Sequence, residues 1–467
     1  MAPHHAEPTA LAPRPFSLGA PVSPRYLLSC ALSLLGNSVA GVILPLILLA
    51  TTGDPLAAGA LALICAAPQM IIGLVGGALI DRFNRRNVSI ISDLMSAASV
   101  ALLPVVDMIW GLSFGWFVVL GLVGAIGDIP GMTARDALLP AVCERDGKSL
   151  QKFMGLAQSL DSLTVIVGPA LAAFLMTTIG DASALWFTAA MSLAAALVTL
   201  TLPRAIGRTG AQDAETAPAT TSRGVVRDAL SSLKSGVVVL FKRDALLRAS
   251  MLLTFGIVMV MGSFQGLVLP VHFTDAGTPE LLGYVLSAMS AGMLVSSLAY
   301  SALAHKLRRR TWFALSLFGM ALGLLTMGLL PTFPVMVGGA ALLGLSAGPA
   351  SALLGFFVFD RIPAENRGAA LGTQNSLMLV AAPVAVFATS VVVETAGLAV
   401  AGVGLIVCWG AVTAWALTTP NLHHMGDLER RATPAAPTVP GAPAVPGAPA
   451  TPVPAPSAIP MPDRCCD

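Results

Sequence analysis

The chain has 467 residues, of which 55% are hydrophobic and only 11% charged, and its mean hydropathy is +0.81. A soluble protein carries about 25% charged residues, so this composition excludes an ordinary soluble enzyme or binding domain. The 26 lysines and arginines nearly balance the 24 acids. We therefore expect the lipid bilayer as a partner and no nucleic acid.

Apolar segments recur along most of the chain. Each is long enough to cross a hydrocarbon core of about 30 Å as a helix. The sequence therefore predicts an all-α membrane protein with twelve transmembrane helices, at residues 26–50, 57–80, 88–110, 113–135, 150–178, 182–203, 246–271, 280–304, 311–330, 334–359, 367–394 and 398–418.

The basic residues predict the orientation of these helices. All lysines and arginines fall on one side: in the N-terminal tail, in the loops after even-numbered segments or at the segment ends beside these loops, or in the C-terminal tail. The opposite loops carry only acids, such as Asp54, Asp107 and Glu280. By the positive-inside rule, both termini are cytoplasmic.

Composition also predicts the domain organisation. We expect a tail at 1–25, a six-helix bundle at 26–203, a cytoplasmic linker at 204–245, a second bundle at 246–418 and a Pro/Ala-rich disordered tail at 419–467. Within the linker, Val225 to Phe241 alternates apolar and basic residues like a helix at a membrane surface.

The loop between the second and third segments carries the most specific motif. Its pattern Gly-x3-Asp-Arg-x2-Arg-Arg resembles the signature loop of the major facilitator superfamily. Asn84 replaces a glycine of that pattern, and asparagine tolerates positive φ. The matching residues are Gly77, Asp81, Arg82, Arg85 and Arg86.

The resemblance implies two six-helix bundles around a central cavity that opens alternately to each side. Residues 301–310 repeat the loop at 77–86, and residues 372–377 repeat 155–160. Because each half has an even number of helices, these repeats run parallel, related by an axis along the membrane normal. The family resemblance also implies that the loop closes the cytoplasmic side against Asp360 and the helix that follows it.

Two further stretches resemble the drug and siderophore exporters called the third drug:proton antiporter family, which includes macrolide exporters. One is Ala134-Arg135-x-Ala-Leu-Leu-Pro. The other is Gly155-x8-Thr164-x3-Gly168-Pro169, which is similar to an antiporter motif. The second motif implies export and close helix packing at Gly155, Gly168 and Pro169.

Acids inside apolar segments are the candidates for proton coupling. Asp161 lies roughly 13 Å along a helix from Lys152, near mid-bilayer, and is the first candidate. Asp128 precedes Pro130 and Gly131, which we expect to break the helix, so it either caps a restarted helix or takes part in proton or substrate chemistry.

Asp93 lacks the same-helix arginine that is frequent in the family, and Arg135 is its nearest partner by depth. We group both with the signature loop as a cytoplasmic gate. Uncharged polar side chains inside helices are candidates for the substrate cavity, although hydrogen bonds between helices are the commoner use of such groups. These candidates are Asn37, Gln69, Gln158, Gln265 and Asn375.

Together these features predict proton-coupled efflux of hydrophobic or amphipathic small molecules by a monomer in a bacterial inner membrane. A facilitator or importer on the same fold, or a non-transporting receptor, remains an alternative. No enzyme signature occurs, no cofactor is implied, and the pairs His4-His5 and His423-His424 lack further metal ligands.

Overall fold

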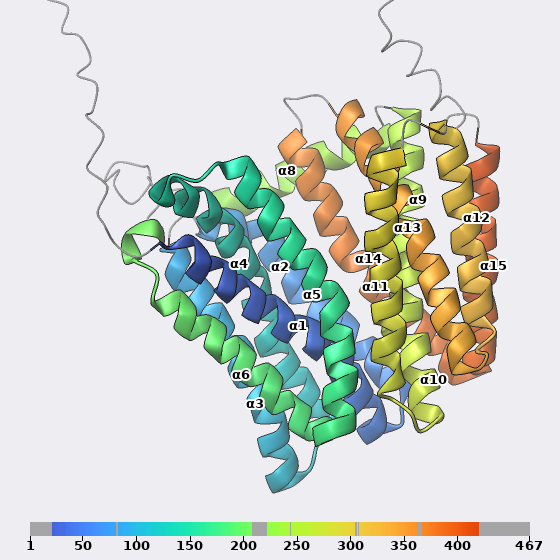
Figure 1. The fold of residues 1–467 in the computed structure, drawn as a ribbon, viewed down its shortest axis with the longest axis horizontal. Helices are drawn as coiled ribbons and strands as arrows, with labels where there is room; N and C mark the ends of the chain where they lie inside the picture. Colours follow the sequence, from blue (N-terminus) through green and yellow to red (C-terminus); the bar gives the residue numbers. More distant parts are fainter. Residues whose placement is uncertain are drawn as a thin grey trace, which may run out of the picture. The chain divides into compact units, whose positions relative to one another are not determined.

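A computed structural model describes residues 21–80, 83–207, 222–242, 244–303, 306, 308–362 and 367–419. All regular structure among these residues is helical (Figure 1). Twelve of the helical segments are long and apolar enough to span a membrane. The predicted all-α membrane fold is therefore confirmed. The predicted N-terminal tail, the first part of the linker and the C-terminal tail fall mostly outside the described residues.

The helices follow one another with short connections. Their bounds are α1 (Ser23–Thr52), α2 (Pro55–Ile80), α3 (Arg85–Trp110), α4 (Phe114–Asp146), α5 (Leu150–Ile179), α6 (Asp181–Leu200), η1 (Arg204–Gly207), α8 (Ser222–Lys242), α9 (Ala245–Ser263), η2 (Phe264–Val268), α10 (Leu269–Asp275), α11 (Leu281–Leu303), α12 (Arg309–Gly328), α13 (Phe333–Arg361), α14 (Arg367–Ala396) and α15 (Leu398–Thr418).

Helix packing repeats between the two halves of the chain. The first six helices pack as α1 with α5 and α6, α2 with α4, α3 with α4 and α6, and α5 with α6. The second half repeats each pair in the same order: α9 with α14 and α15, α11 with α13, α12 with α13 and α15, and α14 with α15. The repeat predicted from the sequence is therefore present in the packing.

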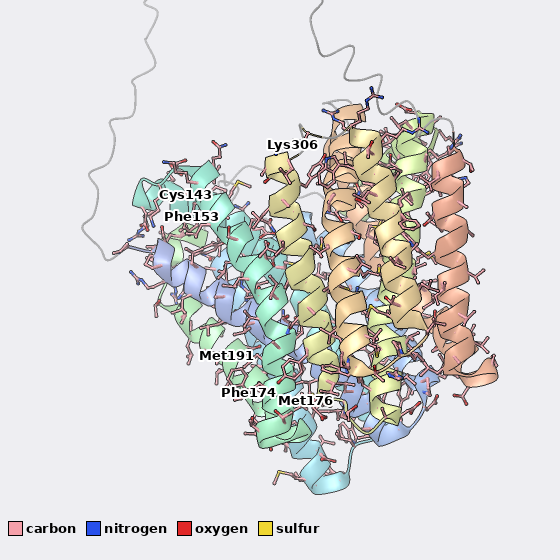
Figure 2. All side chains as sticks on the ribbon, turned by 45° about the vertical axis from the view of Figure 1, so that its right-hand side comes forward. Cys143, Phe153, Phe174, Met176, Met191 and Lys306 are labelled. Carbon is pink, nitrogen blue, oxygen red and sulfur yellow. The ribbon has the colours of Figure 1, made fainter. Side chains whose placement is uncertain are left out.

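The two ends of the helices differ in charge. We call the end next to the loops after α2, α4 and α11 the basic end, and the opposite end the acidic end. Figure 2 shows Cys143, Phe153 and Lys306, which lie near basic loops of both halves, at the upper end, and Phe174 and Met176 at the lower end. The basic loops of both halves thus share one side.

Helix α4 corrects the predicted boundary of the fourth segment. It runs unbroken to Asp146, whereas the sequence predicted an end at residue 135 and a break at Pro130 and Gly131. Neighbouring helices support prolines inside membrane helices, and Gly131 packs so closely on α3 that a Cβ there would lie 1.9 Å from Ser92 Oγ. Asp128 therefore lies within a continuous helix and does not cap a restarted one.

The end of α4 holds the start of α1. Asp146 Oδ2 accepts hydrogen bonds from the backbone N–H of Val22 and Ser23, at 2.9 and 2.7 Å, and from Ser23 Oγ at 2.6 Å. Free N–H groups at a helix start attract a carboxylate. The sequence analysis missed this contact, because a lone acid beside Gly147 looks like any loop acid.

Replacing Asp146 by asparagine should therefore destabilise the protein. Charge-assisted capping contacts are each worth about 1–2 kcal/mol, and an amide retains only part of that. We expect a lower unfolding temperature for the purified Asp146→Asn protein in detergent. Glu144→Gln removes an exposed acid from the same helix end and should leave it unchanged; equal temperatures for the two variants would contradict the assignment.

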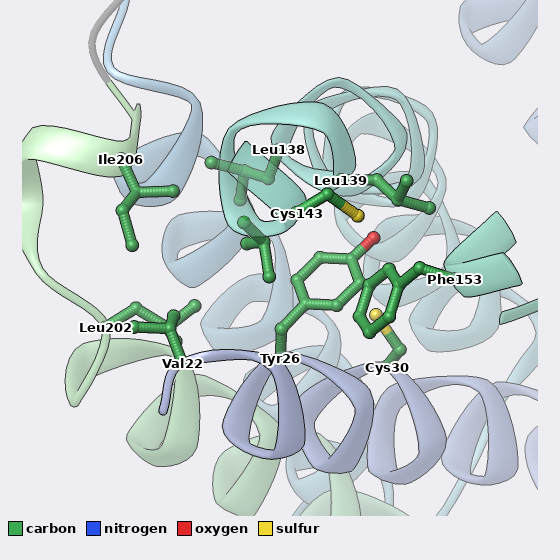
Figure 3. Close-up of a cluster of buried hydrophobic side chains, with 10 residues drawn as sticks. Val22, Tyr26, Cys30, Leu138, Leu139, Cys143, Phe153, Leu202 and Ile206 are labelled. Carbon is green, nitrogen blue, oxygen red and sulfur yellow. The ribbon is translucent and has the colours of Figure 1, made fainter. Parts of the chain in front are cut away.

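Behind this contact lies a cluster of buried side chains at the basic end (Figure 3). Tyr26 of α1 faces Phe153 of α5, with ring centroids 5.9 Å apart. Leu138 and Val142 of α4 are fully buried beside them. The cluster packs α1, α4 and α5 against one another at the basic end. This packing fixes the relative positions of the three helices and therefore of the polar side chains deeper in them.

The segment predicted at 246–271 is a helix with an internal irregularity. It runs as α9, then the π-turn η2, then α10. A π-turn inserts an extra residue into the helix and often occurs at functional positions. Gln265 and Gly266 lie on this turn.

Candidate functional site

One cavity lies among α1, α2, α3 and α4. It has a volume of about 370 Å³ and is lined mainly by apolar side chains such as Leu44, Leu61 and Phe117. Gly266 on η2 contributes from the second half. The cavity brings together two of the predicted substrate residues, Asn37 and Gln69, with Asp128.

Among the described residues, Asp128 is the only acid that lines this cavity, and no described lysine or arginine lines it. Within the described part of the chain, its carboxylate forms no hydrogen bond and no ion pair. Leaving such a charge alone inside a membrane costs at least about 3 kcal/mol. Water, a proton, a ligand or a charge elsewhere in the chain must therefore compensate the carboxylate.

A second cavity, of about 520 Å³, lies among α1, α4 and α5 toward the basic end. Asp161 and Gln158 of α5 line it together, and Gln158 Nε2 donates a hydrogen bond of 3.4 Å to Asp161 Oδ2. Arg135 and Asp136 of α4 face the same cavity. The sequence analysis missed Asp136, because it occupies the variable position of the motif that begins at Ala134. Its place next to Arg135 was the available signal.

Arg135 also reaches away from this cavity to Asp93 of α3. The two side chains form a salt bridge in which Asp93 is 2% and Arg135 11% exposed. Ser33 Oγ donates a further hydrogen bond of 2.9 Å to Asp93 Oδ1. The partner predicted for Asp93 is confirmed, and Tyr26 steadies that part of α4 by donating its hydroxyl to the Arg135 backbone carbonyl at 3.0 Å.

The described arginines of the signature loop bind backbone carbonyls of two neighbouring helices. Arg85 Nη1 donates to the Ala137 carbonyl of α4 at 3.1 Å, and Arg86 Nη2 donates to the Leu200 carbonyl of α6. Leu200 is the last residue of α6, and carbonyls at a helix C-terminus lack helical partners, so they attract guanidinium groups. Ala137 lies within α4, so Arg85 adds a second hydrogen bond to a carbonyl of the continuous helix. These contacts fix the start of α3 within the first half.

Asn84 does not use the positive φ that asparagine tolerates. Its φ is −67°, and its Oδ1 caps α3 by accepting a hydrogen bond from the Arg86 backbone N–H. An extended residue with a side-chain acceptor is what a helix N-cap requires. Asp81 and Arg82 lie outside the described residues, and the surroundings of Gly77 and of the Asp360 side chain are not described, so their predicted contact stays a prediction.

Two residues of the antiporter-like segment of α5 lie in close packing. A Cβ on Gly168 would lie 2.1 Å from Ser38 Oγ of α1. The carbonyl of Pro169 would lie 2.1 Å from a Cβ on Gly283 of α11. Small residues at these positions allow the helix backbones to meet.

Gly155 does not lie in such a contact, contrary to the prediction. It is exposed, and a Cβ there would meet nothing within 4 Å. The reason is that this part of α5 borders the second cavity, whose lining includes Met154 and Ala157. Gln265 and Asn375 line neither of the two cavities, so their place in a substrate cavity stays a prediction.

The two halves of the chain meet toward the acidic end. Ser287 of α11 donates a hydrogen bond of 2.8 Å to the Ile166 carbonyl of α5. On the other side of the molecule, a Cβ on Gly59 of α2 would lie 2.1 Å from Ser390 Oγ of α14. No comparable packing joins α4 or α5 to α13 or α14 in the described ranges.

Comparison with known proteins agrees with this architecture. The family model described as Major Facilitator Superfamily matches residues 26–268 and 251–454. The chain is 29% identical to the "Multidrug efflux pump Tap" of Mycolicibacterium fortuitum, over 78% of this chain and 87% of that protein. It is 24% identical to "Macrolide efflux protein A" of Streptococcus pyogenes, over 79% and 88%.

Solved structures show the same fold. The nucleoside transporter NupG superposes with a TM-score of 0.66 at 14% identity, covering 86% of this chain and 98% of its own. A bacterial homologue of the iron transporter ferroportin, in an inward-facing state, superposes with a TM-score of 0.62 at 15% identity, covering 85% and 99%. From its helices, their repeated packing and the matched family model, the chain is a multi-pass membrane protein that belongs to the major facilitator superfamily.

Proposed function

We propose that the protein exports hydrophobic or amphipathic small molecules in exchange for protons, by alternating access, as a monomer in a bacterial inner membrane with both termini in the cytoplasm. The names of its relatives, efflux pumps for multiple drugs and for macrolides, support export. The observation that carries the proposal is the cavity of about 370 Å³, where an apolar lining surrounds the carboxylate of Asp128, which forms no hydrogen bond or ion pair within the described chain. Such a lining suits an apolar molecule, and the carboxylate suits a proton.

The described conformation corresponds to the inward-facing state in this proposal. The basic end is cytoplasmic by the positive-inside rule. The close contacts between the halves lie toward the acidic end, at Gly59 and Ser287 among others. The second cavity lies toward the basic end, where a molecule from the cytoplasm enters. Rocking of the halves then closes the basic end and opens the acidic one.

The proton step belongs to the first half. In the described part of α9 to α15 and in the loops between them, acids occur only near helix ends or in loops: Asp275, Glu280, Asp360 and Glu394. The first half instead buries Asp93 and places Asp128 and Asp161 at cavities. We assign proton uptake from the outside and release to the cytoplasm to Asp161 together with Asp128.

The gate consists of the signature loop and the residues around Asp93. We assign the Asp93–Arg135 pair, with Arg85 and Arg86, to holding the first half together while the basic end is open. In the opposite state, Asp81 and Arg82 beside Gly77 would meet the region of Asp360. A Cβ on Gly155 would meet nothing in this conformation. In the opposite state, we expect this part of α5 to pack against the second half.

Uphill transport distinguishes a proton-coupled antiporter from a facilitator on the same fold, because only the antiporter can concentrate a compound. Inverted membrane vesicles that contain the protein are acidified inside by respiration, and uptake of a fluorescent dye or antibiotic is followed. An antiporter accumulates the compound above the outside concentration, and an uncoupler releases it. A facilitator stops at equal concentrations, and that result would reject proton-coupled export.

The closed acidic end predicts a strong effect of Gly283→Val. A valine side chain collides with the Pro169 carbonyl, so the variant should hold the two halves apart at the acidic end and trap the opposite state. The formation rate of a disulfide between cysteines introduced at the acidic ends of α5 and α11 measures this, and it should fall sharply. Gly338→Val, where a Cβ meets nothing within 4 Å, should leave it unchanged. Equal rates would show that the contact does not close that end.

A further inference from the structure

Helix α8 of the linker packs at the depth where the membrane-spanning helices end. Its residues Val239 and Leu240 are buried in a small cluster with Leu247 and Met251 in the first turns of α9, Ile362 at the end of α13 and Ala370 in the first turn of α14. Thr373 Oγ1 also donates to the Leu233 carbonyl. All these partners lie at the basic end, so α8 sits at the level of the lipid headgroups there.

The opposite side of α8 is exposed and mixes apolar with basic residues. Lys234, Val238 and Lys242 follow one another at four-residue spacing, so they form one stripe along the helix. Val237 beside them is 37% exposed and Val238 is 43% exposed. Neither lysine forms an ion pair or hydrogen bond with the part of the chain that the structure describes.

This combination has a specific chemical partner. A helix at headgroup depth inserts exposed valines among the upper acyl chains, while lysine side chains extend toward the headgroup phosphates. Lysine beside a membrane favours anionic lipids, because a zwitterionic headgroup offers no net negative charge. The partner that complements the stripe in both charge and polarity is therefore an anionic phospholipid.

We propose that the face of α8 formed by Lys234, Val237, Val238 and Lys242 is a binding site for anionic phospholipids of the leaflet at the basic end. The site lies on a helix that contacts both halves of the chain: α8 packs against α2 of the first half and α14 of the second. These two helices pack against each other across the halves. A lipid bound on α8 thus lies beside α2 and α14, one helix from each half.

The test uses the full-length protein in detergent micelles. An environment-sensitive fluorophore is placed at Ser235→Cys, an exposed position next to Lys234, after the six native cysteines are replaced by alanine. Dioleoylphosphatidylglycerol should shift the emission of the fluorophore to the blue at low mole fraction, and dioleoylphosphatidylcholine should not. Each lysine contributes about five-fold to the lipid affinity, so Lys234→Gln with Lys242→Gln should weaken the response by about 25-fold.

Two controls make the result decisive. Lys148→Gln with Lys152→Gln removes the same charge from another exposed surface at the basic end and should leave the response unchanged. High salt should weaken the emission shift of the labelled protein that keeps both lysines. This measurement tests whether lipid binding is electrostatic even if the α8 variant is unstable. An equal response to both lipids, an undiminished response in the α8 variant, or the same shift with inorganic phosphate alone would each overturn the proposal.

Discussion

Asp128→Asn should abolish uphill transport in energised vesicles while leaving passive exchange of the same compound intact. The carboxylate lines the 370 Å³ cavity, and its surroundings in the described chain offer it no hydrogen bond or ion pair. An amide keeps the size and polarity of the side chain but cannot carry a proton. The coupling between proton and compound should therefore disappear, whereas the apolar walls that bind the compound stay as they are.

The matched control is Asp107→Asn, which removes an exposed acid near the end of α3. Uphill accumulation should be retained there, and the uncoupler should still release the compound. If Asp128→Asn accumulates compound as well as Asp107→Asn does, Asp128 takes no part in coupling. If it instead loses passive exchange as well, the carboxylate serves binding or folding and our assignment is wrong.

Arg135→Gln should be among the most destabilising single changes in the protein. It leaves Asp93, which is 2% exposed, without its cation. Removing one member of a buried ion pair costs about 3–5 kcal/mol, because the remaining charge stays buried and uncompensated. The unfolding temperature in detergent should fall strongly, together with the yield of monodisperse protein.

The double variant Asp93→Asn with Arg135→Gln distinguishes a buried pair from an independent role of the arginine. Removing both charges should recover most of the lost stability. Arg248→Gln, a change at an exposed arginine of α9, provides the control and should leave stability within about 0.5 kcal/mol of the unsubstituted protein. A double variant as unstable as Arg135→Gln would mean that Arg135 stabilises the fold through other groups, such as Asp136.

Hydropathy and composition predicted the membrane-spanning helices well, because a span of about twenty apolar residues leaves a bilayer protein few alternatives. The exception is α4, whose last turns continue past Arg135 to Asp146. Hydropathy marks where a helix leaves the hydrocarbon, and it does not mark where the helix ends. Prolines predict breaks in water more reliably than in a membrane, where neighbouring helices support the backbone.

The sequence also predicted the partner of Asp93, since depth along two helices limits which charges can meet. It did not reveal that Asp128 and Asp161 line different cavities, because that depends on the rotation of α4 and α5 about their axes. Asp146 and Asp136 were also missed. The role of Asp146 follows from neighbours more than 100 residues away, which no local pattern indicates. Asp136 stands next to Arg135 in the sequence, but only the structure shows that it faces a cavity.

The measurement that tests the account most directly is proton flux triggered by a transported compound. The purified protein is reconstituted into vesicles with a pH-sensitive dye inside, and compounds from a panel of dyes and antibiotics are added one at a time. The account predicts that a transported compound moves protons in the opposite direction, and that Asp161→Asn moves none. Movement of compound without protons, in both proteins, would contradict it and identify a facilitator in which Asp161 is structural.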